Sequence, residues 1–142
     1  MRRALALGKA AGERGEIPIG AVIIDDAGSV LAEAANAREE LADPTAHAEV
    51  LALRAAGQAR GQWRLHGCTL VVTVEPCAMC AGAAVLARVD RVIFGAWEAK
   101  TGACGSVRDL VRDTRLNHRV DVIAGVCGRE AAHLMRSRFV RD

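Results

Sequence analysis

Two short segments of the chain carry residue types that can bind a metal ion and move protons. The first is Pro44-Thr45-Ala46-His47-Ala48-Glu49, and the second is Glu75-Pro76-Cys77-Ala78-Met79-Cys80. Cys77 and Cys80 are three residues apart at a predicted helix start, so both sulfur atoms can face one ion. The positive end of that helix favours their thiolate forms. This spacing predicts a metal site at the start of the helix.

His47 supplies a third candidate ligand from the start of another predicted helix. Zinc takes sulfur and imidazole ligands in a tetrahedral arrangement, and three protein ligands leave one position open for water. An open position is typical of catalytic zinc sites, whereas structural sites usually close with four ligands. Glu49 is predicted to stand outside the ligand set and to act as general base and acid.

Each of these residues also has an ordinary structural interpretation. A lone histidine is often a core residue, a Cys-x-x-Cys pair can be a redox pair or part of a zinc ribbon, and a glutamate in a first helical turn often interacts with the helix dipole. The combination is more specific, because His-x-Glu followed about 30 residues later by Pro-Cys-x-x-Cys is the signature of zinc-dependent nucleobase deaminases. The remaining cysteines and histidines lack ligand spacing and are assigned no metal: Cys68, Cys104, Cys127, His66, His118 and His133.

The elements that must position these residues follow from periodicity and turn signals. Apolar runs predict strands at residues 19–24, 29–34, 69–74, 89–95 and 120–124. Helices are predicted at 2–14, 43–56, 77–87 and 130–141, with a short helix or turn at 108–113. Asp43 is placed as the N-cap of the second helix and Pro44 as its first residue. No linker or repeat interrupts the pattern, so we predict one α/β/α domain over residues 1–142.

Composition narrows the class of protein. The chain has 142 residues, of which 51% are hydrophobic and 25% charged, as in a globular domain. No apolar run reaches the roughly 20 residues of a membrane span, and the N-terminus lacks the apolar stretch of a secretory signal, so we expect a cytoplasmic protein. The basic residues are nearly all arginine, which suits contacts with phosphates and bases. A solvated arginine-rich surface is the alternative.

Further stretches of the chain, taken with the two metal-binding segments, resemble the bacterial tRNA adenosine deaminases of the TadA family. The zinc signature is common to all cytidine-deaminase-like enzymes, whereas Asp43-Pro44-Thr45-Ala46-His47-Ala48-Glu49, Lys100-Thr101-Gly102-Ala103 and Asn117-His118-Arg119 are more specific to the tRNA branch. The matching stretches, in chain order, are 17–22, Asn36, 43–49, 75–83, 94–96, 99–103 and 117–120.

The resemblance implies a three-layer α/β/α cytidine-deaminase-like fold, with a central mixed five-stranded sheet and helices on both faces. It implies a homodimer with one Zn²⁺ per subunit, held by His47, Cys77 and Cys80, and Glu49 as the catalytic residue. The implied reaction is hydrolysis of adenosine to inosine at the wobble position of a tRNA anticodon stem-loop. The substrate contacts that it implies are Asn36, Ala48, Lys100, Thr101 and Gly102.

Two alternatives share part of this signature. A deaminase of a free nucleobase or nucleoside, of the guanine or cytidine type, would use the same zinc chemistry but would be insensitive to salt. A non-catalytic, zinc-stabilised RNA-binding module would need neither Glu49 nor an open metal position. Trp97 and Glu98 differ from the residues that the family commonly has, and Trp97 is expected either to stack on a base or to pack at the dimer interface.

Overall fold

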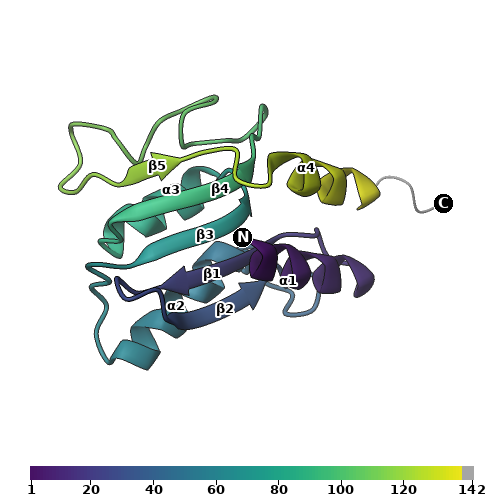
Figure 1. Ribbon diagram of the computed structural model, residues 1–142, viewed down its shortest axis with the longest axis horizontal. Coiled ribbons are helices and arrows are strands. Elements are labelled where there is room, and N and C mark those ends of the chain that lie inside the picture. Colours follow the sequence, from purple (N-terminus) through teal and green to yellow (C-terminus); the bar gives the residue numbers. More distant parts are fainter. Residues whose placement is uncertain (139–142) are drawn as a thin grey trace.

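A computed structural model describes residues 1–138 of the chain, in which five strands form one sheet in the order β2-β1-β3-β4-β5 (Figure 1). β1 pairs antiparallel with β2 and β3, whereas β3, β4 and β5 run parallel. The predicted mixed five-stranded sheet is therefore confirmed. The elements in chain order are α1 (Arg2–Glu13), β1 (Gly20–Ile24), β2 (Val30–Ala35), α2 (Ala48–Arg60), β3 (Thr69–Val74), α3 (Ala78–Leu86), β4 (Arg91–Ala96), β5 (Asp121–Ile123) and α4 (Gly128–Ser137).

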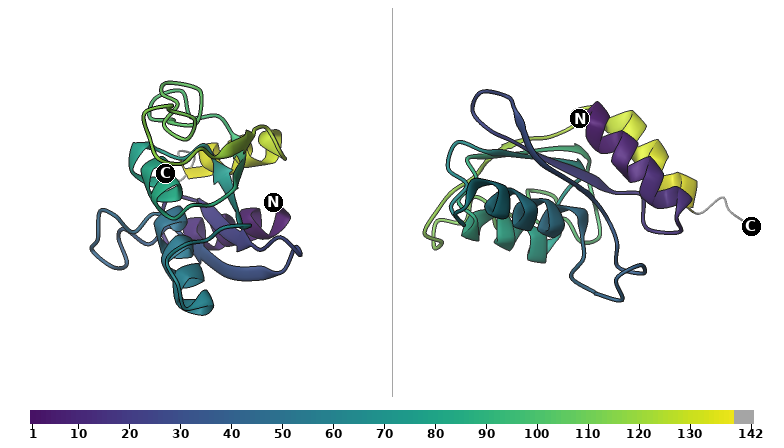
Figure 2. Two further views of the ribbon diagram at one scale, coloured as in Figure 1. Left: turned by 90° about the vertical axis from the view of Figure 1, so that its left-hand side faces the viewer. Right: turned by 90° about the horizontal axis from the view of Figure 1, so that it is seen from below.

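The helices cover both faces of the sheet, as predicted. α2 and α3 lie together on one face, and α1 and α4 lie together on the other (Figure 2). α2 turns small side chains toward the sheet, and its Ala48, Ala52 and Ala56 are fully buried. Such small residues let a helix approach the strands closely, so a chain with few aromatic residues still fills its core.

The parallel pair β3 and β4 sets the position of the chemistry-bearing segments. β3 is buried along its length from Leu70 to Val74, as its β-branched composition predicts. Val74 at the end of β3 pairs with Ala96 at the end of β4. Because the carboxyl ends of the two strands meet at one edge of the sheet, the segment that follows β3 and the loop that follows β4 begin side by side.

The predicted helix at 43–56 is wrong at both ends. The carboxylate of Asp43 accepts hydrogen bonds from the backbone N–H and the hydroxyl of Thr45, 2.8 Å each, so Asp43 organises a turn instead of capping the helix. α2 begins only at Ala48, with His47 as its N-cap. It continues through Gly57 to Arg60, and its C-cap, Gly61, has a φ of 73°, the left-handed conformation that glycine favours at helix ends.

Smaller differences concern other element boundaries. The segment 108–113, predicted as a short helix or turn, contains a turn at residues 111–112 and an isolated antiparallel bridge of Asp109 with Cys104. β4 covers residues 91–96 instead of 89–95. α4 begins at Gly128, two residues before the predicted start, and ends at Ser137. Phe139 and Arg141, which were predicted to belong to that helix, lie outside the described residues. Within residues 1–138, no helix combines the length and the hydropathy that a membrane span requires.

Candidate metal centre and active site

Three candidate ligand atoms converge at the N-terminal ends of α2 and α3. His47 and Cys77 are the N-cap residues of these helices, and Cys80 lies in the first turn of α3. Nδ1 of His47 lies 3.7 Å from Sγ of Cys77 and 3.5 Å from Sγ of Cys80, and all three ligand atoms lie within 4.8 Å of one another. Nitrogen and sulfur ligands of one tetrahedral zinc ion stand about 3.5 Å apart, given ordinary bond lengths. The three donor atoms therefore fit a single zinc ion.

The proximity of the three side chains shifts their pKa values. The hydrogen bond with Cys80 lowers the pKa of the Cys77 thiol to about 4, and a second bond with His47 adds to this effect. The same contact with Cys77, together with burial, raises the pKa of Cys80. The bond with Cys77 also raises the pKa of His47. A metal ion needs the deprotonated forms of these groups, so its binding here releases protons.

Glu49, in the first turn of α2, is a buried carboxylate beside this cluster. Its side chain is 2% exposed, and among the described residues its Oε2 has no hydrogen-bond partner. Burial raises its pKa, because the charged carboxylate loses the hydration that it has in water. A carboxyl group with a raised pKa and an unpaired oxygen is suited to accept and return a proton.

Asn36, which follows β2, is a second buried residue with an unpaired polar atom. It is 2% exposed, and its Oδ1 has no partner within the described part of the chain. With His47 and Ala48 it lines a cavity of about 30 Å³, whose wall is completed by Ile17, Ile19 and Arg38. Buried polar atoms are normally hydrogen-bonded, so an unpaired amide next to a candidate metal ligand points to a bound molecule.

The other predicted substrate residues lie on the loop after β4, which we call the 97–106 loop. Lys100 and Thr101 are exposed, whereas Gly102 is buried and pairs antiparallel with Cys77. The N–H of Ala103 donates a hydrogen bond of 2.8 Å to the carbonyl of Pro76. The structure therefore brings Gly102 to the metal ligands and places Lys100 and Thr101 at the surface of the same loop.

Trp97 and Glu98, where the chain differs from the family pattern, begin this loop. The indole of Trp97 is 55% exposed, and its ring meets the buried ring of Phe94 edge to face at 4.9 Å. Oε1 of Glu98 accepts a hydrogen bond of 3.0 Å from the N–H of Lys100. An exposed aromatic face held on a buried one is a rigid surface for contact with a partner.

Glu16 and Glu75 are two further buried carboxylates, and no sequence pattern was strong enough to assign them roles. Glu16 is 3% exposed and accepts the backbone N–H groups of Glu39 and Glu40, at 3.3 and 2.8 Å. Glu75 is 2% exposed and accepts N–H groups from the 97–106 loop. An acidic residue directly after a buried strand is the one clue that the sequence offers for Glu75.

The remaining cysteines and histidines of the described chain do not belong to the metal-ligand cluster. Cys68 and Cys104 are buried free thiols, and burial raises the pKa of Cys104 to about 12. The rings of His66 and His118 meet edge to face at 6.2 Å, and Nε2 of His118 lies 2.7 Å from the carbonyl of Val89. These contacts give structural roles to the pair.

Along nearly its whole length, the sequence is similar to proteins whose activity is known. Residues 1–96 match the family model of the cytidine and deoxycytidylate deaminase zinc-binding region. The chain is 45% identical to a tRNA-specific adenosine deaminase of Bacillus subtilis (strain 168), covering 100% of this chain and 87% of that one. It is 44% identical to one of Haemophilus influenzae (strain ATCC 51907 / DSM 11121 / KW20 / Rd), covering 98% and 80%. A solved structure from work on A-to-I editing by tRNA:A34 deaminases at the wobble position of transfer RNA superposes with a TM-score of 0.90. That chain is 44% identical, with 94% of this chain and 96% of that one covered.

Proposed function

Because this chain belongs to the cytidine and deoxycytidylate deaminase family and, within it, to the tRNA-specific adenosine deaminases, we propose that it hydrolyses adenosine to inosine at the wobble position of a tRNA anticodon with the residues described above. One observation carries the assignment of roles: three convergent ligands lie beside a buried carboxylate, Glu49, whose Oε2 is unpaired among the described residues. The overall reaction consumes one water and releases one ammonia, while the C6–N bond of adenine is replaced by a C6–O bond.

His47, through Nδ1, and Cys77 and Cys80, through their sulfur atoms, would hold one zinc ion per chain. When bound, zinc supplies a Lewis acid that makes water a nucleophile near neutral pH. The chain itself provides one thiolate for this purpose, since the pKa of Cys77 is already low before a metal arrives. Cys80, whose pKa is raised by its contact with Cys77 and by burial, gives up its proton when the metal binds. Three protein ligands are the set typical of a catalytic zinc site.

Glu49 moves the protons of the reaction. Its ionised carboxylate takes up one proton from the attacking water, and its acid form delivers that proton to ring nitrogen N1. The carboxylate then takes the second proton from the new hydroxyl on C6 and delivers it to the departing amino group, which leaves as ammonia. Burial raises the pKa of Glu49, so the carboxyl can hold the proton between the two steps. Its position in the first turn of a helix fixes the side chain against the ligand cluster.

Asn36 orients the base. Its amide can accept and donate hydrogen bonds at the edge of a purine, and its Oδ1 is left without a partner among residues 1–138. The backbone around Ala48 forms the adjoining wall of the cavity. Adenine must leave its stack to reach this depth, which costs least in a single-stranded loop such as that of an anticodon.

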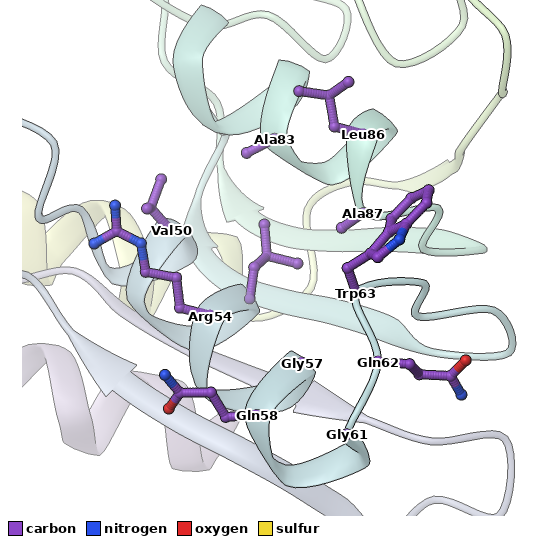
Figure 3. Close-up of a pocket in the computed structure, with 11 residues that line it drawn as sticks. Val50, Arg54, Gly57, Gln58, Gly61, Gln62, Trp63, Ala83, Leu86 and Ala87 are labelled. Atoms are coloured by element: carbon purple, nitrogen blue, oxygen red, sulfur yellow. The ribbon is translucent and has the colours of Figure 1, made fainter.

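We propose that the chain forms a homodimer through the exposed face of α2 and α3. α3 has no charged residue; its Ala81, Ala84 and Val85 are buried, yet Leu86 is 69% exposed. Side by side, the two helices line a groove of about 680 Å³ that Trp63 borders at one end (Figure 3). A helix that is apolar all round is normally buried, so a second copy of the chain is the proposed occupant.

Light scattering coupled to size-exclusion chromatography tests this assembly. The wild-type chain is expected to elute as a dimer, and Leu86→Arg as a monomer, because a charge would be buried at the centre of the contact. A wild-type monomer, or a Leu86→Arg variant that remains dimeric, would show that the groove serves another purpose.

The proposed substrate is a tRNA anticodon stem-loop. Because tRNA is used in the cytoplasm, we propose that the protein acts there. The test is product analysis for the purified zinc-loaded protein, offered tRNA and free adenosine, guanine and cytidine in parallel, with inosine, xanthine and uridine as the respective deamination products. We expect inosine in tRNA alone, at the wobble nucleotide, with a rate at limiting tRNA that falls steeply as salt rises. Deamination of a free base or nucleoside with tRNA untouched would contradict the substrate, and zinc binding without any deamination would contradict catalysis.

A further inference from the structure

The 97–106 loop is built around one carboxylate, that of Glu75. Oε1 of Glu75 accepts the N–H of Glu98 at 3.0 Å, and Oε2 accepts those of Cys104 at 3.0 Å and Ser106 at 3.1 Å. Ser106 closes the frame, because its hydroxyl donates a bond of 2.9 Å to the carbonyl of Glu98. Both ends of the loop are therefore tied to a single buried side chain.

The same carboxylate lies under the middle of the loop. A Cβ on Gly102 would collide with Oε1 of Glu75, so this glycine is the residue that allows the loop to rest on the carboxylate. Gly102 also pairs with Cys77, two residues beyond Glu75, and its N–H donates a bond of 2.9 Å to the carbonyl of Glu98. Glu75 is thus the shared support of the loop and of the segment that leads into the metal ligands.

What the loop presents outward is suited to a nucleic acid. Trp97 offers an exposed ring, and Lys100 and Thr101 offer a cation and a hydroxyl, all exposed. Aromatic rings stack on bases, and lysine and hydroxyl groups contact phosphates. The side chain of Glu75 is 2% exposed and can touch none of a substrate directly.

We propose that Glu75 is a positioning residue for tRNA: its carboxylate holds the 97–106 loop in the conformation that binds the anticodon loop, without contact with the reacting atoms. The role of Glu75 in binding rests on the proposed tRNA substrate, whereas its role in holding the conformation of the 97–106 loop does not. Glu75→Gln keeps the size of the side chain and replaces one acceptor oxygen by a donor, which then faces a backbone N–H. The loop consequently loses at least one of its three anchors.

The composition of the chain provides a reporter within the loop itself. The sequence contains two tryptophans, Trp63 and Trp97, so Trp63→Phe leaves Trp97 as the sole source of indole fluorescence. In that background, Glu75→Gln is expected to increase acrylamide quenching of Trp97 at unchanged zinc content. Glu16→Gln is the matched control, because Glu16 is equally buried and accepts two backbone N–H groups, but from residues 39 and 40. It should leave the quenching of Trp97 as it was.

Kinetics in the chain with both tryptophans then test the role in binding. Glu75→Gln is expected to raise KM for a tRNA about tenfold, with kcat per bound zinc changed less than about threefold. Ser106→Ala removes the closing bond of the frame and the bond of the hydroxyl with the Glu75 carboxylate, but it keeps the three backbone N–H anchors. It should shift KM in the same direction by less, and it provides the test if Glu75→Gln does not fold.

Several outcomes would overturn the proposal. Unchanged quenching and unchanged KM in both variants would show that the loop keeps its conformation without the anchors. A fall in kcat at constant KM, or activity lost in proportion to zinc, would show that Glu75 acts on the metal segment and not on binding. If the wild-type protein does not edit tRNA, the proposed function fails, whereas the fluorescence still decides whether Glu75 holds the loop.

Discussion

Glu49 at the start of α2 and Glu75 at the end of β3 are carboxylates of equal burial and opposite surroundings. Both are 2% exposed. Oε2 of Glu49 has no partner among the described residues, whereas the two oxygens of Glu75 accept three backbone N–H groups. Burial raises the pKa of Glu49. Burial would also raise the pKa of Glu75, but the hydrogen bonds of Ser106, Glu98 and Cys104 outweigh it and lower that pKa.

The difference teaches that burial alone does not identify a catalytic acid. A carboxylate whose two oxygens both accept fixed donors is stabilised in its ionised form and is a poor acceptor for a proton in transit, so its value lies in the backbone that it holds. A carboxylate with one oxygen that lacks a partner is costly to bury and is retained where its chemistry is used. The hydrogen bonding of the carboxylate oxygens therefore distinguishes the residue that transfers protons from the residue that positions the loop.

The largest expected effect comes from removing the metal beside Glu49. Cys80→Ser replaces a buried thiolate ligand by a hydroxyl, which binds zinc poorly, so deamination should become undetectable and zinc per chain should fall well below one. Trp97 quenching in the Trp63→Phe background should stay unchanged, because the 97–106 loop rests on Glu75. Zinc content by elemental analysis checks the first point; a variant with full zinc and full activity would remove Cys80 from the ligand set.

Asn36→Ala probes the other unpaired acceptor. Loss of its hydrogen bonds to the base should lower kcat/KM for tRNA about thirtyfold, the effect of one or two bonds to a buried polar group. Zinc content should not change, since Asn36 stands outside the ligand set. The measurement is steady-state kinetics at several tRNA concentrations, and an unaltered kcat/KM would mean that Asn36 serves the fold alone.

Substitution of the two carboxylates should affect stability differently. In the metal-free protein at neutral pH, Glu75→Gln is expected to lower the free energy of unfolding by about 1–3 kcal/mol, because a buried N–H loses its acceptor. Glu49→Gln should leave it unchanged or raise it by up to about 1 kcal/mol, since an ionised, unpaired oxygen is removed from the interior. Urea titrations of both variants measure these changes in the free energy of unfolding. Equal destabilisation of the two variants would contradict the proposed difference between Glu49 and Glu75.

The pH dependence of stability also distinguishes the two carboxylates. The pKa of Glu75 is lowered below the ordinary value of 4.5, so its stabilising contribution is complete above that pH and is lost as pH falls through the lower, folded-state value. Glu75→Gln removes this titration, so the stability difference between the variant and the wild type should shrink in acid. Urea midpoints measured from pH 7 down to the acid limit would show it.

The smallest expected effect concerns Trp97. If its exposed ring stacks on a base of the anticodon loop, Trp97→Ala should raise KM for tRNA about tenfold, whereas Trp97→Phe should keep much of the binding. Packing of Trp97 at the dimer contact would instead make Trp97→Ala lower the dimer fraction at low protein concentration. Kinetics and light scattering on the same preparations separate these two interpretations.

Most of the fold could be predicted from the sequence, because strand and helix signals are local. Prediction of the β-branched run of β3 needed no knowledge of distant residues. The start of α2 could not be predicted, since Asp43 and Pro44 form an equally good helix start and turn, and the choice is made by the hydrogen bonds of Asp43 to Thr45. The structure thus moves His47 from inside a helix to its N-cap.

The metal ligands could be predicted, whereas their support could not. Ligand spacing is a local pattern, and His47, Cys77 and Cys80 do converge. Glu75 gains its role from the N–H groups of residues 98, 104 and 106, more than 20 positions away, and Glu16 from those of residues 39 and 40. Every residue other than proline has a backbone N–H, so a backbone donor is not visible in the residue type. No sequence motif therefore predicts which distant loop a buried carboxylate will bind.

The most direct test of the account is the single-turnover deamination rate of Glu49→Gln at saturating tRNA, measured with zinc per chain equal to that of the wild type. Glutamine fills the same space but cannot take up the proton, so the rate should fall about 10²- to 10⁴-fold with tRNA affinity retained. A variant that holds its zinc and forms inosine at the wobble position near the wild-type rate would show that Glu49, whose Oε2 is unpaired among the described residues, is not the proton carrier.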